Sequence, residues 1–514
     1  MTIKTINLHS EIYNLANTRM YWIAQLILLA TLLPVEIAAQ TSGSNPVIEE
    51  NRKPGTTDWI MTRVERHANE PYEEGWHVRK EIQAYTSHTS IRTGDTLRIY
   101  VSTDPADTYK IDIYRMGYYG GKGARLMKSI TPLSGGMRGS PRPVPEPAEG
   151  SGLIECRWEE SVKFRIPDDW LSGVYLGKLR TWRKSDSEAY IVFIVRDDRR
   201  TDIIFQCSDM TWLAYNRWPQ WRSFYDSPTE KWAARAPDNY DVSFDRPYTI
   251  FWNGLPASFE PLTNGSGEFL MTEFPLAFWL EKEGYDVTYI SNVDTHADGQ
   301  GLLRGKVWLS VGHDEYWTQE MYDNVVSARD AGVSLAFLSG NSVSGRVKLL
   351  PGGSGVPNRV MTMVDRGFEE ENLMGSKSYG VGLADWICAA PDHWAFEGTG
   401  MKKGDRIPNL VGWEFHGPPL AKGAKDLVVL AEGPVRNASG ETSRRTYAST
   451  LYTAPLGNLV FNAATCWWNK VLAAPPAFIN PPYIDFSQGD ERVRTITRNI
   501  LDRMISEGAG ISKK

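Results

Sequence analysis

Residues Lys306 to Trp317 read KVWLSVGHDEYW. The first half, 306–311, is a short apolar run of the kind that forms a strand buried on both faces of a parallel sheet. A helical spacing over 318–331 and a second apolar run over 333–338 follow directly. Strand, helix and strand in this order predict a right-handed crossover between parallel strands. The segment therefore predicts the centre of an α/β sheet.

The same alternation extends outward from this segment in both directions. Further strands are expected at 202–207, 286–290, 427–430 and 459–463, and further helices at 273–283 and 491–506. The last helix carries one apolar stripe that includes Val493, Ile496 and Ile500. Together these elements predict a doubly wound, mostly parallel α/β sheet of the flavodoxin or amidotransferase kind over 201–512.

Before Arg199 the pattern changes to short runs with β-branched and aromatic alternation, and no amphipathic helix stands among them. The runs occupy 81–85, 96–102, 109–114, 153–158, 174–182 and 189–195. They predict a β-sandwich of the immunoglobulin type over 61–200. The polar residues 40–60, which are rich in Pro, Gly and Ser, predict a linker in front of it.

The N-terminal residues 1–39 have the pattern of a secretory signal peptide. Lys4 and Arg19 precede an uncharged run over 20–35, and Ala38-Ala39 supplies small residues for cleavage. The run has 16 residues, whereas a membrane-spanning helix needs about 20. We predict a secreted or periplasmic protein that does not contact the membrane after cleavage. An uncleaved N-terminal membrane anchor is the alternative.

Composition excludes several classes of partner. The net charge of the chain is -6 at pH 7, so no nucleic acid is expected, because such binding needs a clustered basic face. Four cysteines in 514 residues are too few for a disulfide scaffold. The sequence leaves open whether Cys156, Cys207, Cys388 or Cys466 form disulfides, and whether the protein is a homo-oligomer or has a small partner subunit.

Candidate site residues follow the predicted strands, because ligands of an open α/β sheet bind outside the carboxyl ends of its strands. The richest group is His313-Asp314-Glu315-Tyr316, in which His313 or Glu315 is expected to act as a general base. A weaker substrate pocket is predicted from Tyr215, Asn216, Asn341 and His393. His393 belongs to a second polar cluster over 392–400, with the Trp413-Glu414-Phe415-His416 group shortly after it.

Several familiar chemistries lack their motifs. The sequence contains no H-E-x-x-H zinc motif and no G-x-S-x-G nucleophile elbow. The glycines of 117–123 have the wrong spacing for a phosphate loop, which favours a tight turn flanked by aromatic residues. Without an elbow, Cys207 is interpreted as a buried core thiol.

A set of short motifs, in a fixed order, resembles the family defined by the C-terminal region of the N,N-dimethylformamidase large (beta) chain, from about residue 75 to 510. The motifs are 113–125 (IYRMGYYGGKGAR), 214–216 (AYN), 243–247 (SFDRP), 284–287 (GYDV), 312–317 (GHDEYW) and 396–400 (FEGTG).

The resemblance implies an amidohydrolase with a small-molecule amide substrate and a mononuclear iron (Fe3+) held by two tyrosines and a glutamate. Tyr316 matches one tyrosine, and Glu397 is the match proposed for the glutamate. The second tyrosine has no counterpart, because this chain has Glu273-Phe274-Pro275 where the family has it. Tyr215 and Tyr289 are the tyrosines expected to approach the same space.

Three functions remain open from the sequence. The first is a hydrolase of a carbon-nitrogen bond that uses water activated by a metal ion. The second is a non-catalytic protein that binds a carbohydrate or a peptide on a degenerate enzyme scaffold. The third is a hydrolase that uses Cys207 with His313 and Glu315, which the missing elbow opposes.

Overall fold

The computed structural model describes residues 45–63, 80–131, 137–182, 184, 186–227, 239–252, 259–419, 426–437, 440–482 and 484–507. The predicted signal peptide, 1–39, lies outside the described residues, so its cleavage stays a prediction. No helix within the described ranges is both long enough and apolar enough to cross a membrane.

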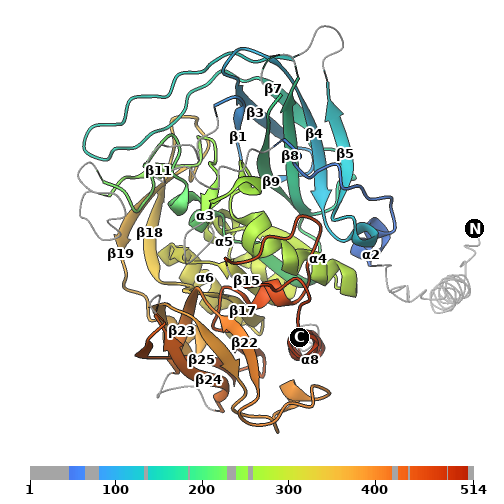
Figure 1. Ribbon diagram of the computed structural model, residues 1–514, viewed down its shortest axis with the longest axis vertical. Helices are drawn as coiled ribbons and strands as arrows, with labels where there is room; N and C mark the ends of the chain where they lie inside the picture. The colour runs from blue at the N-terminus through green and yellow to red at the C-terminus, as the bar shows by residue number, and fades with distance from the viewer. Residues whose placement is uncertain are drawn as a thin grey trace, which may run out of the picture. The chain divides into compact units, whose positions relative to one another are not determined.

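A seven-stranded sheet forms the centre of the fold (Figure 1). Its strands, in spatial order, are β14 (Val287–Ser291), β10 (Thr201–Cys207), β15 (Gly305–His313), β17 (Ser334–Gly340), β26 (Leu459–Asn462), β25 (Thr442–Thr453) and β24 (Val428–Arg436). The first five are parallel, and β25 and β24 are added antiparallel. The prediction of a mixed α/β fold with a mostly parallel sheet is confirmed, and the strands expected at 202–207, 306–311 and 333–338 are present.

Helices cover both faces of this sheet because alternate residues of each strand point to opposite sides. In β10, Ile203 and Phe205 share a core with helices α4 (Phe274–Glu283) and α8 (Glu491–Glu507). Ile204, between them, shares the opposite core with α3 (Asp209–Tyr215) and α6 (Gln319–Asp330). The helices expected at 273–283, 318–331 and 491–506 are therefore confirmed.

The strand order fixes where a site can form. β10 comes first along the chain, and the next two strands, β14 and β15, pair with opposite sides of it. The chain therefore proceeds from β10 to one side of the sheet first and then to the other, so the strand order reverses between β10 and β15. In open α/β sheets such a reversal produces a crevice at the carboxyl ends of the strands. β15 ends there at His313. A closer likeness to flavodoxin or amidotransferase sheets stays a prediction.

Two sheets form before residue 200. One contains β2 (Ser90–Arg92), β9 (Glu188–Arg196), β8 (Gly173–Thr181), β4 (Thr108–Met116) and β5 (Ala124–Ile130), with β6 (Met137–Arg138) beside β4. The other contains β1 (Gln83–Thr86), β3 (Thr96–Ser102) and β7 (Val162–Arg165). Both sheets contribute side chains to one core, among them Leu97 and Ile111. The immunoglobulin type of this arrangement and the boundary near residue 200 stay predictions.

One strand expected in this region is wrong. Residues 153–158 form no strand; the segment leaves both sheets and reaches residues beyond 200. Its apolar side chains Ile154, Cys156 and Trp158 pack against Trp218 in a small separate cluster. Cys156 N donates to the carbonyl of Asp245 at 2.7 Å. The alternation of apolar residues here reflects burial against a loop rather than against a second sheet.

Residues 45–60, part of the predicted linker, contain a helix and buried contacts. Helix α2 (Pro46–Asn51) is capped by Asn45, whose side chain accepts from Val47 N at 2.9 Å. Trp59 is fully buried and donates from its indole to the carbonyl of Lys122 at 3.1 Å. Polar residues in this segment are used for capping and for hydrogen bonds to the rest of the fold, which composition alone does not reveal.

The glycine-rich segment 117–123 is the tight turn that the sequence predicts. A 3-10 helix, η2 (Tyr119–Gly121), lies inside it, and Gly120, Gly121 and Gly123 all have positive φ. Tyr119, within the turn, is buried. The turn leads into strand β5 and not into an α-helix. It therefore lacks the helix N-terminus that holds the phosphate in a phosphate loop.

Between β17 and β26, the chain forms several short pairs of strands outside the central sheet. Residues in and next to these pairs lie near the end of β15. The hairpin of β18 (Gly345–Leu350) and β19 (Val360–Asp365) joins β16 (Tyr316–Trp317) and β11 (Val242–Ser243) in one sheet. β20 (Ser376–Val381) pairs with β23 (Glu414–Pro419), and β21 (Ala384–Ile387) pairs with β22 (Arg406–Val411). These pairs bring Arg366 and Glu414 to the candidate site.

Candidate functional site

The site begins where β15 ends. His313 pairs in register with Gly340 of β17, so it lies at the carboxyl edge of the central sheet. Gly312 precedes it with φ of +71°, and a Cβ there would lie 2.9 Å from the side chain of Thr272. Glycine is therefore required at this turn, which directs His313-Asp314-Glu315 across the top of the sheet.

Asp314 holds this turn in place. Its carboxylate accepts hydrogen bonds from Gln206 Nε2 (2.9 Å), Asn292 Nδ2 (2.9 Å) and Ser310 Oγ (2.8 Å). Burial raises the pKa of Asp314 to about 6, although these hydrogen bonds oppose the shift. Because its partners come from the ends of β10, β14 and β15, Asp314 ties the three strand ends together and has a structural role.

Glu315 is the centre of a tyrosine network. Its Oε2 accepts from the hydroxyls of Tyr215 (2.8 Å) and Tyr225 (2.9 Å), and its Oε1 accepts from Arg366 (2.9 Å). The hydroxyl of Tyr316 in turn donates to the hydroxyl of Tyr225 at 2.5 Å. Burial alone would raise the pKa of Glu315, but Arg366 and then His313 outweigh it and lower the pKa. This carboxylate is therefore held in its charged form.

His313 lies among three carboxylates. Its Nε2 is 2.6 Å from Glu414 Oε2 and 3.5 Å from Glu315 Oε2, and its Nδ1 is 4.0 Å from Glu268 Oε2. Burial alone would lower the pKa of His313, but Glu414 and then Glu315 and Glu268 raise it to about 9. Burial raises the pKa of Glu268 to about 7.

The His313–Glu414 contact leaves hydrogen-bonding capacity unused. Both ring nitrogens of His313 and the Oε2 of Glu414 are buried without an aligned hydrogen bond. Such groups are rare in folded proteins, where about nine in ten or more buried polar groups are paired. His313, Glu315 and Glu414 each offer one ligand atom, and these atoms lie within 4.8 Å of one another. An imidazole nitrogen and two carboxylate oxygens form a donor set that fits a metal cation.

Comparison with known proteins agrees with the motifs. The family model described as N,N-dimethylformamidase beta subunit-like, C-terminal, matches residues 110–482, which is more than half of the 514 residues. The chain belongs to this family. No curated protein matches it.

A solved structure also matches part of the chain. It is a cycloisomaltooligosaccharide glucanotransferase from Paenibacillus sp., complexed with cycloisomaltoheptaose. The sequences are 9% identical, and the match covers 60% of this chain and 61% of that chain, with a TM-score of 0.18. Likeness at this level supports no statement about the fold or the function.

The structure brings together four of the residues that the sequence predicts for the site. His313, Glu315, Tyr316 and Tyr215 are linked through the contacts described above. Asn341 lies directly after Gly340, the register partner of His313, and is 7% exposed. The loop that carries it is fixed by His416, whose Nε2 accepts from Ser342 N at 2.8 Å.

Asn216 lies in the fold away from this network. Its Nδ2 donates to the carbonyl of Pro247 at 2.9 Å, and its Oδ1 accepts from Trp218 N and Thr249 N. With both ends of its amide used by backbone groups, Asn216 shapes the loop after α3 and is not available to a substrate.

Glu397, the glutamate ligand inferred from the family resemblance, is not part of the buried group formed by His313, Glu315 and Glu414, and its role as a ligand stays a prediction. Glu397 is exposed at the end of the 3-10 helix η6 (Trp394–Phe396), and its carbonyl accepts from Asn499 of α8 at 2.8 Å. The glutamate beside His313 is instead Glu414. Its sequence signal was the Trp413-Glu414-Phe415-His416 group, which the pairing of β23 with β20 carries to the sheet edge.

Two other expected residues also lie elsewhere. His393 is half-buried and caps η6, with its Nδ1 accepting from Ala395 N at 3.3 Å. Tyr289 donates to Glu281 Oε1 at 3.0 Å in a different buried cluster. The tyrosines that surround Glu315 are Tyr215 and Tyr225, and Tyr225 follows no predicted strand.

The cysteines have structural roles. All four are free and buried. Burial, followed by Glu273 and Asp209, raises the pKa of Cys207 well above its usual value. A nucleophilic cysteine needs the opposite shift, because the thiolate is the reactive form. Cys207 is therefore the core thiol that the sequence predicts, and the third function lacks support.

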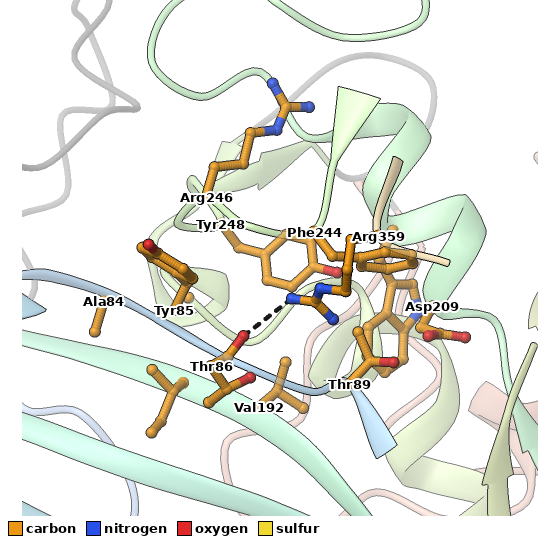
Figure 2. Close-up of a pocket in the computed structure, with 13 residues that line it drawn as sticks. Ala84, Tyr85, Thr86, Thr89, Val192, Asp209, Phe244, Arg246, Tyr248 and Arg359 are labelled. Atoms are coloured by element: carbon orange, nitrogen blue, oxygen red, sulfur yellow. Dashed lines mark hydrogen bonds between the residues drawn. The ribbon is translucent and has the colours of Figure 1, made fainter. Parts of the chain in front are cut away.

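A second enclosed space lies where the β1–β2 loop meets the end of β10. Figure 2 shows Arg359 reaching the carbonyl of Thr86, to which it donates at 3.0 Å. The lining also includes Asp209 and Tyr248, whose Oδ2 and hydroxyl are buried without a partner. The cavity measures about 20 Å³, which is room for one water molecule. Its size excludes a substrate.

Proposed function

We propose that the protein hydrolyses the carbon-nitrogen bond of a small amide with the help of a metal ion held by His313, Glu315 and Glu414. One observation carries the proposal. These three groups are buried together at the carboxyl edge of the central sheet, and two of them contain polar atoms without a hydrogen-bond partner. Membership in a family named after N,N-dimethylformamidase supports the amide as substrate class.

When bound, the ion would act as a Lewis acid on the amide carbonyl and would lower the pKa of a water molecule. The resemblance of the motifs favours Fe3+, which hard oxygen donors suit. Tyr316, the ligand expected from the sequence, takes a supporting position in this proposal, since its hydroxyl donates to Tyr225 and Tyr225 holds Glu315.

Glu268 supports the site from the other side of the imidazole ring. Glu315 is a poor base, because two tyrosines and Arg366 hold its charged form. Glu268 is 3% exposed, and its Oε2 lies 4.0 Å from Nδ1 of His313, whereas Glu315 and Glu414 approach Nε2. A carboxylate in this place orients the ring for a ligand at Nε2.

The reaction balances with water alone. The oxygen of the attacking water bonds to the amide carbon, and the water gives up one proton. The carbon-nitrogen bond then breaks, and the nitrogen takes up that proton and leaves as an amine. The products are a carboxylic acid and an amine.

The test measures amine release from N,N-dimethylformamide and a panel of small amides. The protein is first loaded with iron or zinc. Glu414→Gln removes a proposed ligand, and Glu397→Gln is the matched control because Glu397 is exposed and outside the cluster. We expect wild type and Glu397→Gln to release amine, with a loss of about 100-fold or more in Glu414→Gln, the scale of losing a transition-state contact. Equal rates in all three proteins would contradict the proposal.

The proposal includes a secreted or periplasmic location, with cleavage of the signal peptide after Ala39. The support is the sequence pattern of residues 1–39. Sequencing the N-terminus of the protein from soluble extracellular or periplasmic fractions should give Gln40 or Thr41. Recovery of the intact residues 1–39 in the membrane fraction would favour the anchored alternative.

A second candidate is a non-catalytic binding protein for a carbohydrate or a peptide. It is favoured by Glu273, which stands where the family resemblance requires the second tyrosine. Its Oε1 accepts from Ser208 N (3.0 Å) and Trp212 Nε1 (2.8 Å), so it has a structural use. A protein that binds the metal ion but turns over no amide would support this candidate.

A further inference from the structure

The loop 341–344 connects β17 to β18 at the end of the central sheet, because Gly340, directly before it, pairs in register with His313. Asn341 and Val343 in this loop have positive φ, +51° and +61°. This backbone conformation is unfavourable for a β-branched residue, and it persists only where surrounding contacts hold it. The contacts that hold this loop come from the two segments that carry the proposed carboxylate ligands.

The C-terminal end of the loop is bonded to the segment that carries Glu315. Gly345, the first residue of β18, donates from its N to the carbonyl of Glu315 at 2.9 Å. Ser344 Oγ accepts from Nη1 of Arg366 at 2.9 Å, and the same nitrogen donates to Glu315 Oε1 at 2.9 Å. Both the backbone and the carboxylate of Glu315 are therefore fixed relative to the loop.

The middle of the loop is bonded to the strand that carries Glu414. In β23, Glu414 and His416 are two residues apart, so their side chains point to the same face of the strand. Ser342 N donates to Nε2 of His416 at 2.8 Å. β23 passes close to the end of β17, since a Cβ on Gly340 would lie 2.4 Å from the carbonyl oxygen of Glu414. His416 therefore links the loop to the strand of Glu414.

The partners of His416 determine which ring nitrogen carries the proton. A backbone N–H can only donate, so Nε2, which accepts from Ser342 N, carries none. Nδ1 carries the proton and donates to Oδ1 of Asn462 at 2.7 Å. This oxygen is correctly assigned as an acceptor, because it also accepts from Ala464 N at 2.9 Å. Both nitrogens of His416 are used inside the protein, whereas both nitrogens of His313 lack an aligned hydrogen bond.

The link through His416 is shielded from water. Ser342, His416 and Asn462 are all fully buried. Hydrogen bonds are stronger in such surroundings, and breaking one leaves a buried partner unpaired. The link therefore holds the loop and β23 at a defined separation.

We propose that His416 is a positioning residue that sets the distance between the carboxylates of Glu315 and Glu414. The two glutamates come from separate segments of the chain, and the loop 341–344 bonds to the segment of each. His416 itself would not bind the ion, because both of its nitrogens already have partners. The inference rests on the proposed metal site, and it assigns the spacing of that site to a residue outside the ligand set.

Two variants separate the two hydrogen bonds of His416. In His416→Gln the side-chain amide reaches the position of Nε2, so it can still accept from Ser342 N, but the bond to Asn462 is lost. In His416→Asn the shorter amide reaches only the position of Nδ1, so it can donate to Asn462 but cannot accept from Ser342 N. Each variant loses one buried hydrogen bond, so both should be destabilised to a similar extent. Only His416→Asn releases the loop.

Zinc titration of the full mature chain measures the effect on the site. We expect the zinc dissociation constant to rise about 10- to 100-fold in His416→Asn, the usual effect of losing a residue that orients a metal ligand. His416→Gln should stay close to wild type. The matched control is His393→Asn, because His393 is a half-buried histidine that caps η6 outside the cluster. It should bind zinc as wild type does.

Hydrogen exchange of the metal-free protein gives a readout that needs no ion. The amide of Ser342 should exchange about tenfold faster or more in His416→Asn than in wild type, because local opening exposes it. In His416→Gln it should stay protected.

The inference is overturned if His416→Asn binds zinc and protects Ser342 as wild type does, or if the two variants lose zinc affinity equally. A wild-type protein that binds no zinc overturns the metal site itself, and the inference with it. Wild-type zinc binding that is unchanged in His416→Asn overturns the inference alone.

Discussion

Two buried clusters of charged residues in this protein differ in how completely their atoms are paired. In the first, between the N-terminal sheets and α4, Arg115 donates to both oxygens of Glu281 at 2.9 and 3.1 Å. Glu281 also accepts from Asn51 and Tyr289. In the second, at the end of β15, His313 contacts Glu414 at 2.6 Å without an aligned hydrogen bond.

The difference separates a structural cluster from a binding site. Every charged atom around Arg115 has a partner inside the protein, so the cluster is complete and its removal would damage the fold. In the second cluster the two ring nitrogens of His313 and Oε2 of Glu414 lack an aligned hydrogen bond although they are equally buried. Burying polar atoms in this state costs stability, and an added cation would recover it. Variants in the two clusters should therefore behave differently.

The largest effect is expected in the complete cluster. Glu281→Gln leaves the fully buried Arg115 without its counter-charge, and such a change costs about 3–5 kcal/mol of unfolding free energy. The measurement is chemical denaturation of the variant and the wild type, together with metal content. Metal binding should be unchanged because the cluster does not touch His313.

The control for this prediction is Glu283→Gln, two residues further along α4. Glu283 pairs with Arg498 on the partly exposed side of the helix, where an ion pair contributes less than about 1 kcal/mol. Equal losses in the two variants would show that the Arg115 cluster is no more important than a surface pair.

The second prediction concerns pH in the metal-free protein. The pKa of His313 is raised from 6.5 to about 9 by its carboxylate neighbours. Its stabilising contribution is therefore complete below pH 6.5 and is lost as pH rises through about 9. The size is about 3 kcal/mol, from about 1.36 kcal/mol per unit of pKa. Glu268 acts in the same direction, because burial raises its pKa from 4.5 to about 7.

Denaturation of the metal-free protein at a series of pH values measures this loss. In His313→Gln the part of the slope between pH 6.5 and 9 should disappear. A wild-type stability that rises over this interval would contradict the assigned protonation of the cluster.

The third prediction separates a positioning role from a structural one. Glu268 faces Nδ1 of His313 at 4.0 Å, on the side of the ring opposite Glu414. A carboxylate there orients the ring and keeps Nε2 free for a metal, and losing such a partner lowers metal affinity about 10- to 100-fold. Glu268→Gln should show this loss in a zinc titration with little change in stability. A large loss of stability with unchanged zinc affinity would show that Glu268 has a structural role and does not position His313.

The sequence predicted the central part of the fold well. The apolar runs at 306–311 and 333–338 and the helix at 318–331 have strong periodicity and clear ends, so local pattern was sufficient. The cap at Thr318, which accepts from Met321 N, reinforced the helix. The strand β25 was missed because its polar residues resemble a loop, and pairing with β24 and β26 makes it a strand.

The site was predicted only in part. His313, Glu315 and Tyr316 are adjacent in sequence, and the end of one strand places them. Glu414 and Glu268 reach the same point through the β20–β23 pair and the turn before η4 (Phe269–Glu273). The group 413–416 stands out in the sequence, but local pattern does not show that Glu414 meets His313, because this depends on the pairing of β20 with β23. Glu397 was inferred from the family resemblance instead.

The smallest effect is expected from Tyr316→Phe. It removes one hydroxyl, which donates to Tyr225 but does not touch Glu315 directly. The unfolding free energy should fall by about 1 kcal/mol, the usual net value of one hydrogen bond. Metal content should stay as in the wild type. Loss of the ion in this variant would show instead that Tyr316 binds the metal directly.

The most direct test of the distinction between the two clusters is the metal stoichiometry of the mature protein after incubation with iron or zinc and removal of free ions. Elemental analysis should find one ion per chain in the wild type and in Glu281→Gln, and close to none in Glu414→Gln. A wild-type protein that retains no ion, or a Glu414→Gln variant that retains a full one, would contradict the account.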